Sequence, residues 1–172
     1  DTGLADRLFP DLGAPAVDVI SYLVKLEVDV DTGSFDAIVN VIADVDISVR
    51  QMALDVAGFT VDSVQIDGED AAFEQPGDEL VIELPADSGR RVNATITYSE
   101  AFSAVGLPAG WFQTDGGSYV LNEPDGARRW LPSNDHPSDK AAWRFEITVP
   151  DGVTVSANGD LVQAGGAGVP WI

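Results

Sequence analysis

The residues that could do chemistry gather in one stretch, YVLNEPDGARRWLPSNDHPSDKAAW, which runs from Tyr119 to Trp143. An ordinary β connection needs only Gly, Pro, Asn or Asp at its turning points. This stretch adds a Glu-Pro pair, two arginines, a tryptophan and an Asp-His pair, namely Glu123, Pro124, Arg128, Arg129, Trp130, Asp135 and His136. These groups offer ion pairing, acid–base chemistry or metal ligation, so the functional hypotheses start here.

The two arginines allow two interpretations. They could contact a substrate or another domain, or they could form ion pairs and stack on indole rings within the loop. Candidate partners in the stretch are Asp125, Asp135, Asp139, Trp130 and Trp143. We favour the second interpretation, because it would hold in place a long loop that lacks strand pairing of its own.

His136 could be a metal ligand, an acid–base group or a hydrogen-bonded turn residue. The chain has one histidine and no cysteine, whereas a zinc site takes three or four N, S or O ligands. A zinc site built from His and Cys is therefore excluded, and we favour the turn.

Asp29, Asp31 and Gly33 are spaced like the start of a calcium-binding loop. The twelfth position of that loop should be Glu, but here it is Asn40, so we favour a hairpin turn.

Charge and composition narrow the classes of partner. The 172 residues include 29 acidic and 9 basic ones, which gives a net charge of −20. Such a surface repels phosphate backbones and anionic lipids, so we expect no nucleic acid partner and no membrane insertion. A hydrophobic content of 45% suits one folded domain with a real core. With no cysteine the compartment stays open, and we favour a secreted or cell-envelope protein over a cytoplasmic one.

Apolar and polar residues alternate along most of the chain, which is typical of strands with one buried face. A first long strand covers Tyr22–Val30 and a second covers Ala37–Val49, joined by a turn at Asp31–Gly33. Further strands are predicted at Met52–Val56, Val61–Ile66, Leu80–Leu84, Val92–Tyr98, Trp143–Val149 and Val153–Ala157, the last two as a hairpin. The pattern predicts an all-β fold, an antiparallel two-sheet sandwich of about ten strands with little helix.

Three segments are distinguished along the chain. Residues 1–16 form an irregular lead-in and residues 17–162 form the β domain. Residues 163–172 are a Gly-rich tail that we expect to be largely mobile. Its tryptophan, Trp171, could be part of an interface toward another domain.

Two segments resemble a known family: Glu123–Arg128, and the Asn-Asp-His-Pro-Ser-Asp-Lys-Ala run that follows an aromatic residue and a proline between Trp130 and Ala141. Both are similar to the N-terminal β domain of the aminopeptidase N family of zinc metallopeptidases, the gluzincins, in its bacterial branch. The similarity extends from Val17 to Leu161. Ser133 departs from the family pattern, in which a cysteine is expected.

The resemblance implies a saddle-shaped β domain without its catalytic partner. Family members cut peptides with a zinc ion held by a His-Glu-x-x-His helix and a downstream Glu. This sequence contains neither that motif nor the family's Gly-x-Met-x-Asn substrate strand. We therefore expect no catalytic residue, metal or cofactor in this chain and no activity from it in isolation. Zinc would belong to a thermolysin-like catalytic domain of the same polypeptide, which is the implied partner.

By the same resemblance, Glu123 matches the residue that projects into the catalytic cleft and binds the α-amino group of the peptide substrate. A carboxylate suits an ammonium group, because a charge-assisted hydrogen bond is stronger than a neutral one. The alternative is a solvent-exposed turn residue, and we favour the anchor. The family also holds this loop in a cis peptide, so we predict a cis bond between Glu123 and Pro124.

Two functions follow from these observations. The chain is either the non-catalytic N-terminal domain of a zinc aminopeptidase, which caps the active-site cleft, or a stand-alone β-sandwich module for binding or adhesion. The first predicts an apolar or aromatic patch near Glu123 and Trp171. The second predicts a polar, closed surface.

Overall fold

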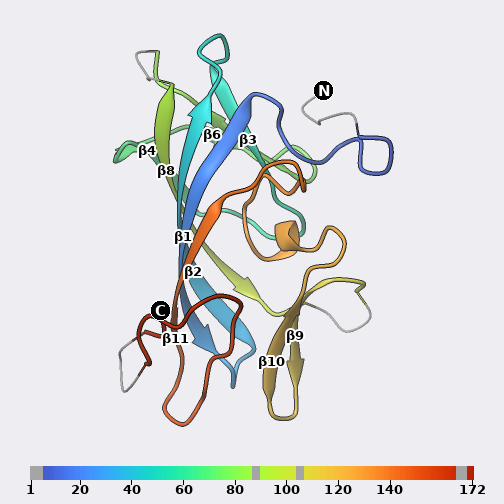
Figure 1. Cartoon of the computed structure of the whole chain (residues 1–172), viewed down its shortest axis with the longest axis vertical. Coiled ribbons are helices and arrows are strands. Elements are labelled where there is room, and N and C mark those ends of the chain that lie inside the picture. The colour runs from blue at the N-terminus through green and yellow to red at the C-terminus, as the bar shows by residue number, and fades with distance from the viewer. Residues whose placement is uncertain (1–5, 87–89, 104–106, 166–169) are drawn as a thin grey trace.

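The computed structural model describes residues 6–86, 90–103, 107–165 and 170–172. Over these ranges the regular structure is almost entirely strand, with one short 3₁₀ helix, η1 (Ala127–Arg129), in the stretch that carries Glu123 (Figure 1). The predicted all-β fold with little helix is confirmed. No helix in the described part of the chain is long and apolar enough to cross a membrane.

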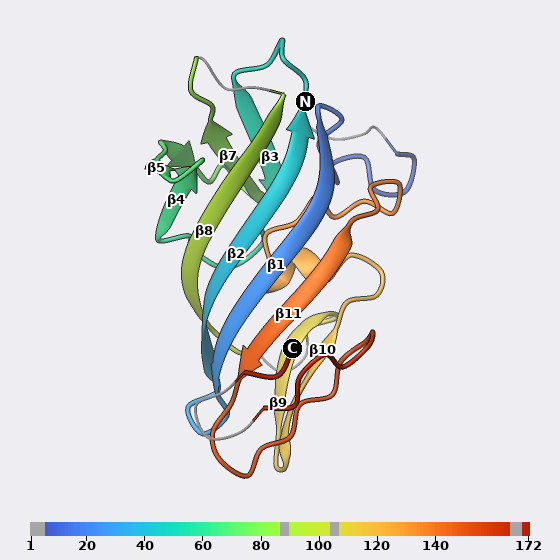
Figure 2. The ribbon, with the colours of Figure 1, turned by 60° about the vertical axis from the view of Figure 1, so that its left-hand side comes forward.

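A six-stranded sheet is the largest layer, with its long strands side by side in Figure 2. Its order is β11 (Ala142–Thr148), β1 (Val17–Asp29), β2 (Ser34–Val45), β8 (Arg91–Ala101), β4 (Ser63–Ile66) and β5 (Glu69–Asp70). The predicted alternation buries one face of this sheet. Val24, Val39 and Ile96 are neighbours across β1, β2 and β8, and all three are fully buried.

The turn between β1 and β2 is a hairpin turn, as expected. The Asp29 carboxylate accepts hydrogen bonds from the backbone N–H groups of Asp31 and Thr32, at 2.9 and 3.1 Å. Gly33 has a φ of 70°, which glycine adopts without steric cost, and its N–H donates to the Asp29 carbonyl at 3.0 Å. The carboxylate is therefore used to close the turn.

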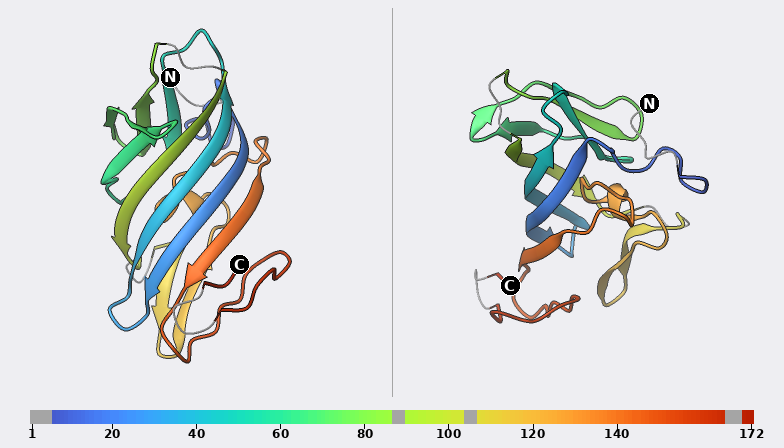
Figure 3. Two further views of the ribbon diagram at one scale, coloured as in Figure 1. Left: turned by 90° about the vertical axis from the view of Figure 1, so that its left-hand side faces the viewer. Right: turned by 45° about the horizontal axis from the view of Figure 1, so that its top comes forward.

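Two smaller sheets complete the fold, so the structure has three sheets where two were predicted (Figure 3). One has the order β3 (Gln51–Asp55), β7 (Glu79–Glu83) and β6 (Phe73–Glu74), and its apolar face joins the core of the large sheet. The other is a hairpin of β9 (Gly110–Thr114) and β10 (Gly117–Leu121). The Gln113 amide anchors this hairpin by donating to the Val30 carbonyl at 2.7 Å.

Two details of the strand prediction are wrong. The second strand ends at Val45, and Ile47, which was expected to face inward, is 74% exposed. Residues 153–157 form no strand, and β11 instead pairs in parallel with β1, with Trp143 beside Tyr22. The long connection after β10 brings the chain back to the starting end of β1, so β11 runs in the same direction as β1. Alternation of side chains does not reveal which strand is the partner.

The two ends of the chain behave differently. The described part of the lead-in is irregular, as expected, but it buries Leu12 and Ala14 against the domain. The tail that was expected to be mobile includes residues 166–169, which lie outside the described residues. Near its end, Trp171 and Ile147 exchange two backbone hydrogen bonds, each 2.8 Å long, so this part of the tail is bound to β11.

Candidate functional site: the Glu123 loop

Glu123 lies in the loop between β10 and η1 and is exposed. The bond between Glu123 and Pro124 is cis, as predicted. Within the described part of the chain, no hydrogen bond or ion pair involves the Glu123 carboxylate. The charged group is therefore available to a ligand or to another domain.

The loop is closed tightly at its base. The Gly126 N–H donates to the Asn122 carbonyl at 2.6 Å, and the Trp130 indole N–H donates to the Asn122 side-chain oxygen at 2.9 Å. A Cβ atom at Gly126 would lie 2.9 Å from the Asn122 Cα and from the Leu121 carbonyl, closer than real Cβ contacts allow. The position of Glu123 thus depends on a glycine three residues later.

Trp130 anchors the far side of the loop in the core. Its side chain is buried, and its carbonyl accepts a hydrogen bond from the Tyr98 hydroxyl at 2.8 Å. Its ring meets Trp111 edge to face, with centroids 5.5 Å apart, and lies 6.4 Å from the Phe145 ring. Tyr98 lies on β8 and Phe145 on β11, so the backbone carbonyl and the ring of Trp130 together connect the loop to two strands of the large sheet.

Arg128 has the structural role that the sequence favoured, with one change of partner. Its guanidinium forms an ion pair with Asp125 at 2.9 Å, as predicted, and a longer one with Asp78 at 3.7 Å. Asp135, also a predicted partner, instead accepts a hydrogen bond from the Arg128 backbone N–H at 3.2 Å. Neither the predicted stacking on an indole nor an ion pair of Arg129 is seen among the described residues.

Asp135 is half-buried and belongs to an acidic pair with the buried Asp55 that the sequence analysis missed. Its N–H donates at 2.7 Å to the carboxylate of Asp55, a β3 residue that is only 2% exposed. The Gly13 N–H donates to the same carboxylate at 3.2 Å. Burial raises the pKa of both Asp55 and Asp135, against backbone donors that lower it. The available signal was a single acid within the apolar segment Met52–Val56.

The segment around His136 is fastened to β1 through Asn134 rather than through the histidine. The Asn134 amide donates to the Val17 carbonyl at 3.1 Å, and its N–H donates to the Tyr22 hydroxyl at 2.9 Å. The His136 imidazole bonds locally to the Ser138 hydroxyl at 2.7 Å and accepts the Ser138 N–H at 3.2 Å. This is the geometry of a turn. No cluster of acidic or histidine side chains suited to a metal occurs in the described ranges.

An exposed apolar strip leads directly to Glu123. Tyr119, Val120 and Leu121 are consecutive residues of β10, and they are 52%, 38% and 45% exposed. The side chains of Tyr119 and Leu121 lie on one face of the strand and that of Val120 lies on the other, and we call these three residues the β10 patch. Exposed apolar groups in sequence with an unpaired carboxylate are typical of a contact surface.

Comparisons with known proteins agree with this geometry. The model of the peptidase M1 N-terminal domain family matches residues 19–166. The chain is also 29% identical over 109 residues to the Probable aminopeptidase 1 of Saccharolobus solfataricus, and this match covers 63% of the chain and 14% of that protein.

Solved structures give the same result. The M1 zinc metallopeptidase from Deinococcus radiodurans matches with a TM-score of 0.85 and 28% identity, over 98% of this chain and 41% of that one. A mutant of that enzyme bound to a Tyr-Ser-Ala substrate matches equally well, with the same TM-score, identity and coverage. Leukotriene A4 hydrolase from Saccharomyces cerevisiae shares the fold, with a TM-score of 0.63 and 21% identity over 78% of this chain and 24% of that one.

The chain thus spans less than half the length of these relatives. The family match, in contrast, covers most of the chain and includes the whole Glu123 loop. On this evidence, the chain belongs to the peptidase M1 N-terminal domain family.

Proposed function

We propose that this domain caps the active-site cleft of a zinc aminopeptidase and presents Glu123 to the α-amino group of the peptide substrate. The observation that carries the proposal is the exposed Glu123 carboxylate, which has no partner in the described part of the chain and stands on a loop fixed from both sides. Zinc and the hydrolytic chemistry would belong to a thermolysin-like catalytic domain of the same polypeptide.

The chemistry of the loop fits this role. A carboxylate binds an ammonium group through charge-assisted hydrogen bonds, and exclusion of water by a neighbouring domain strengthens them. A carboxylate at a fixed distance from the zinc would select peptides by their free N-terminus. The tight base formed by Asn122, Gly126 and Trp130 supports such a fixed distance, since it limits movement of the loop.

The β10 patch supports docking on a catalytic domain. Tyr119 and Leu121 share one face of the strand and precede Glu123 by four and two positions, so a domain that covers this face also lies close to Glu123. The alternative function, a stand-alone binding or adhesion module, predicted a polar, closed surface here. An exposed apolar strip beside an unpaired acid favours the aminopeptidase role.

The test is the substitution Glu123→Ala in the longer enzyme. Loss of a charge-assisted hydrogen bond to the substrate lowers kcat/KM for an amino-acid anilide by about 10- to 100-fold. Asp115→Asn, at the exposed turn between β9 and β10, is the matched control and should leave kcat/KM unchanged. A Glu123→Ala enzyme with kcat/KM within about twofold of the wild type would contradict the anchor.

A second test uses this chain by itself. Mixed with peptide amides and added zinc, it should release no product, because the proposal assigns hydrolysis to the catalytic domain. Measurable hydrolysis that purifies with the chain would overturn that assignment.

A further inference from the structure

The outer edge of β11 is only partly paired. On one side β11 pairs in parallel with β1, from Ala142 beside Ser21 to Thr148 beside Glu27. On the other side Ile147 exchanges two 2.8 Å backbone hydrogen bonds with Trp171. This exchange is the closely spaced pair of an antiparallel ladder, so it fixes both a direction and a register.

The register shows which backbone groups lie open along this edge. The backbone N–H and C=O of Ile147 point away from β1, toward Trp171. Backbone groups repeat every two residues along a strand, and β11 has no register shift, so the N–H and C=O of Phe145 and Trp143 point the same way. Among the described residues, neither has a backbone partner on this side. Two donors and two acceptors are therefore free beside the bonded Ile147.

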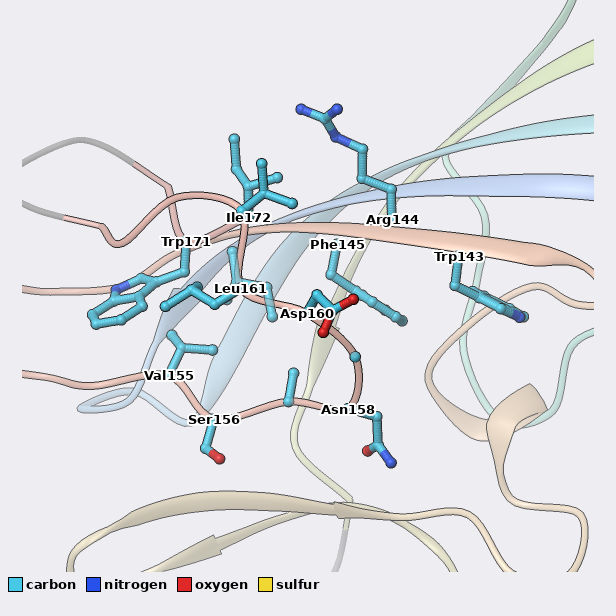
Figure 4. A pocket seen from close by; sticks show the side chains of 14 residues that line it. Trp143, Arg144, Phe145, Val155, Ser156, Asn158, Asp160, Leu161, Trp171 and Ile172 are labelled. Carbon is cyan, nitrogen blue, oxygen red and sulfur yellow. The ribbon is translucent and has the colours of Figure 1, made fainter.

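A groove follows the open edge. It has a volume of about 470 Å³ and lies between β11 and the segment 155–162 (Figure 4). In this view Trp171 marks one end of the groove and Trp143 the other. Trp143 is 45% exposed although it stacks on Tyr22 with ring centroids 3.9 Å apart. Trp143 and Phe145 thus line the β11 side of the groove where the strand edge is unpaired, and Asn158 and Asp160 lie on the opposite segment.

Ile172 directs the chain into this groove. Its N–H donates to the Gln163 carbonyl at 3.0 Å, and its carbonyl accepts the N–H of Val162 at 2.6 Å. Trp171 thus bonds to β11 while Ile172 bonds to the opposite segment, which is the alternation of a strand lying between two neighbours. A polypeptide that continues this strand would run antiparallel to β11, from Ile147 toward Trp143.

We propose that the edge of β11 is a strand-addition site for the polypeptide that directly follows Ile172 in a longer protein. This inference rests on the part of the proposed function that makes the chain one domain of a larger enzyme. The first residue after Ile172 pairs with Phe145 and the third pairs with Trp143. Main-chain hydrogen bonds supply the affinity, as in other cases of β-strand addition.

The register also predicts the character of the added strand. Directly opposed residues of an antiparallel pair place their side chains on the same face. The first and third added residues therefore share a face with Phe145 and Trp143 and are apolar or aromatic. The second shares the opposite face with Arg144 and Glu146, and is polar or charged.

The test extends this chain by Val-Thr-Val-Thr after Ile172 and follows amide hydrogen exchange by NMR. The Phe145 and Trp143 amides should exchange about tenfold more slowly, or slower still, than in the chain that ends at Ile172. The Val39 amide in the central strand serves as a reference for any change in global stability. Fluorescence of Trp143 should shift to shorter wavelength as the added strand covers its ring.

Proline variants make the test specific to the register. Proline at the first and third added positions removes the two N–H donors aimed at β11 and should abolish the protection. Proline at the second position is the matched control, because that N–H points away from β11, and it should retain most of the protection. Equal exchange with and without the extension, or full protection with both donors removed, would overturn the proposal. Neither readout involves zinc or substrate, so failure of the Glu123 anchor would leave this result unaffected.

Discussion

Asp55 accepts a 2.7 Å hydrogen bond from the backbone N–H of Asp135, and this contact joins β3 to the segment between η1 and β11. The same segments also meet through backbone bonds between Asp55 and Ser133, at 2.7 and 3.2 Å. The buried Asp55 carboxylate accepts hydrogen bonds from two backbone N–H groups, those of Gly13 and Asp135. It therefore holds both the lead-in and the segment around Asp135 against β3.

We predict that Asp55→Ala destabilises the domain. Removal of the carboxylate leaves the backbone N–H groups of Gly13 and Asp135 without the oxygen that now accepts from both. Such a loss costs about 1–3 kcal/mol of unfolding free energy, measurable by urea denaturation. Asp62→Ala, at an exposed position, should change the unfolding free energy by less than about 0.5 kcal/mol. Equal effects of the two substitutions would argue against the role of Asp55.

The pH dependence of stability should differ between an acid whose pKa is raised and one whose pKa is lowered. Burial raises the pKa of Asp135, so its contribution to stability is complete below the ordinary aspartate pKa and is lost as pH rises through the raised value. The stability of the wild type relative to Asp135→Asn should therefore fall with rising pH in this range.

Asp44 provides the opposite control. A hydrogen bond from Arg91 holds the Asp44 pKa below its ordinary value. Its contribution is present above the ordinary pKa and is lost as pH falls through the lowered one. Urea unfolding of wild type, Asp135→Asn and Asp44→Asn across the acidic range measures both trends. If the unfolding free energies of the two variants, each relative to wild type, changed with pH in the same direction, the opposite pKa shifts of Asp135 and Asp44 would be contradicted.

Gly126→Ala should distort the base of the Glu123 loop. The new Cβ would lie 2.9 Å from the Leu121 carbonyl, which is a backbone atom of β10 and cannot move away freely. We expect a loss of about 1–3 kcal/mol in unfolding free energy. Gly116→Ala is the control, because nothing lies within 4 Å of its added Cβ. The indole N–H resonance of Trp130 should shift in the first variant and stay in place in the second.

Arg128→Ala should be more costly than Arg129→Ala. The Arg128 side chain is 16% exposed and pairs with Asp125 and Asp78, so its removal leaves two carboxylates without their cation. We expect a loss of about 1–3 kcal/mol in unfolding free energy, against less than about 0.5 kcal/mol for Arg129→Ala. Thermal or urea unfolding of both variants compares them. A larger effect at Arg129 would show that the described ion pairs are not the main contribution.

Alternation of apolar residues was enough to predict most of the long strands. In β1 and β2 almost every second side chain is buried, and a period of two is typical of a strand with one buried face. The hairpin of β9 and β10 was missed because its apolar residues, Trp111–Phe112 and Tyr119–Leu121, are consecutive in sequence and show no alternation. The partner of β11 was wrong for another reason: a strand pattern states which face is buried, but not which edge is paired.

The sequence by itself determined three things: an all-β domain, the stretch that carries the candidate functional residues, and the absence of a zinc site built from His and Cys. These depend only on residue type and spacing. Tertiary structure decided the rest. It brought Asp55 to Asp135, 80 positions apart, and Trp171 to Ile147, and it left the Glu123 carboxylate without a partner among the residues that the structure describes. Such contacts arise from the path of the chain between strands, and local residue preferences do not encode that path.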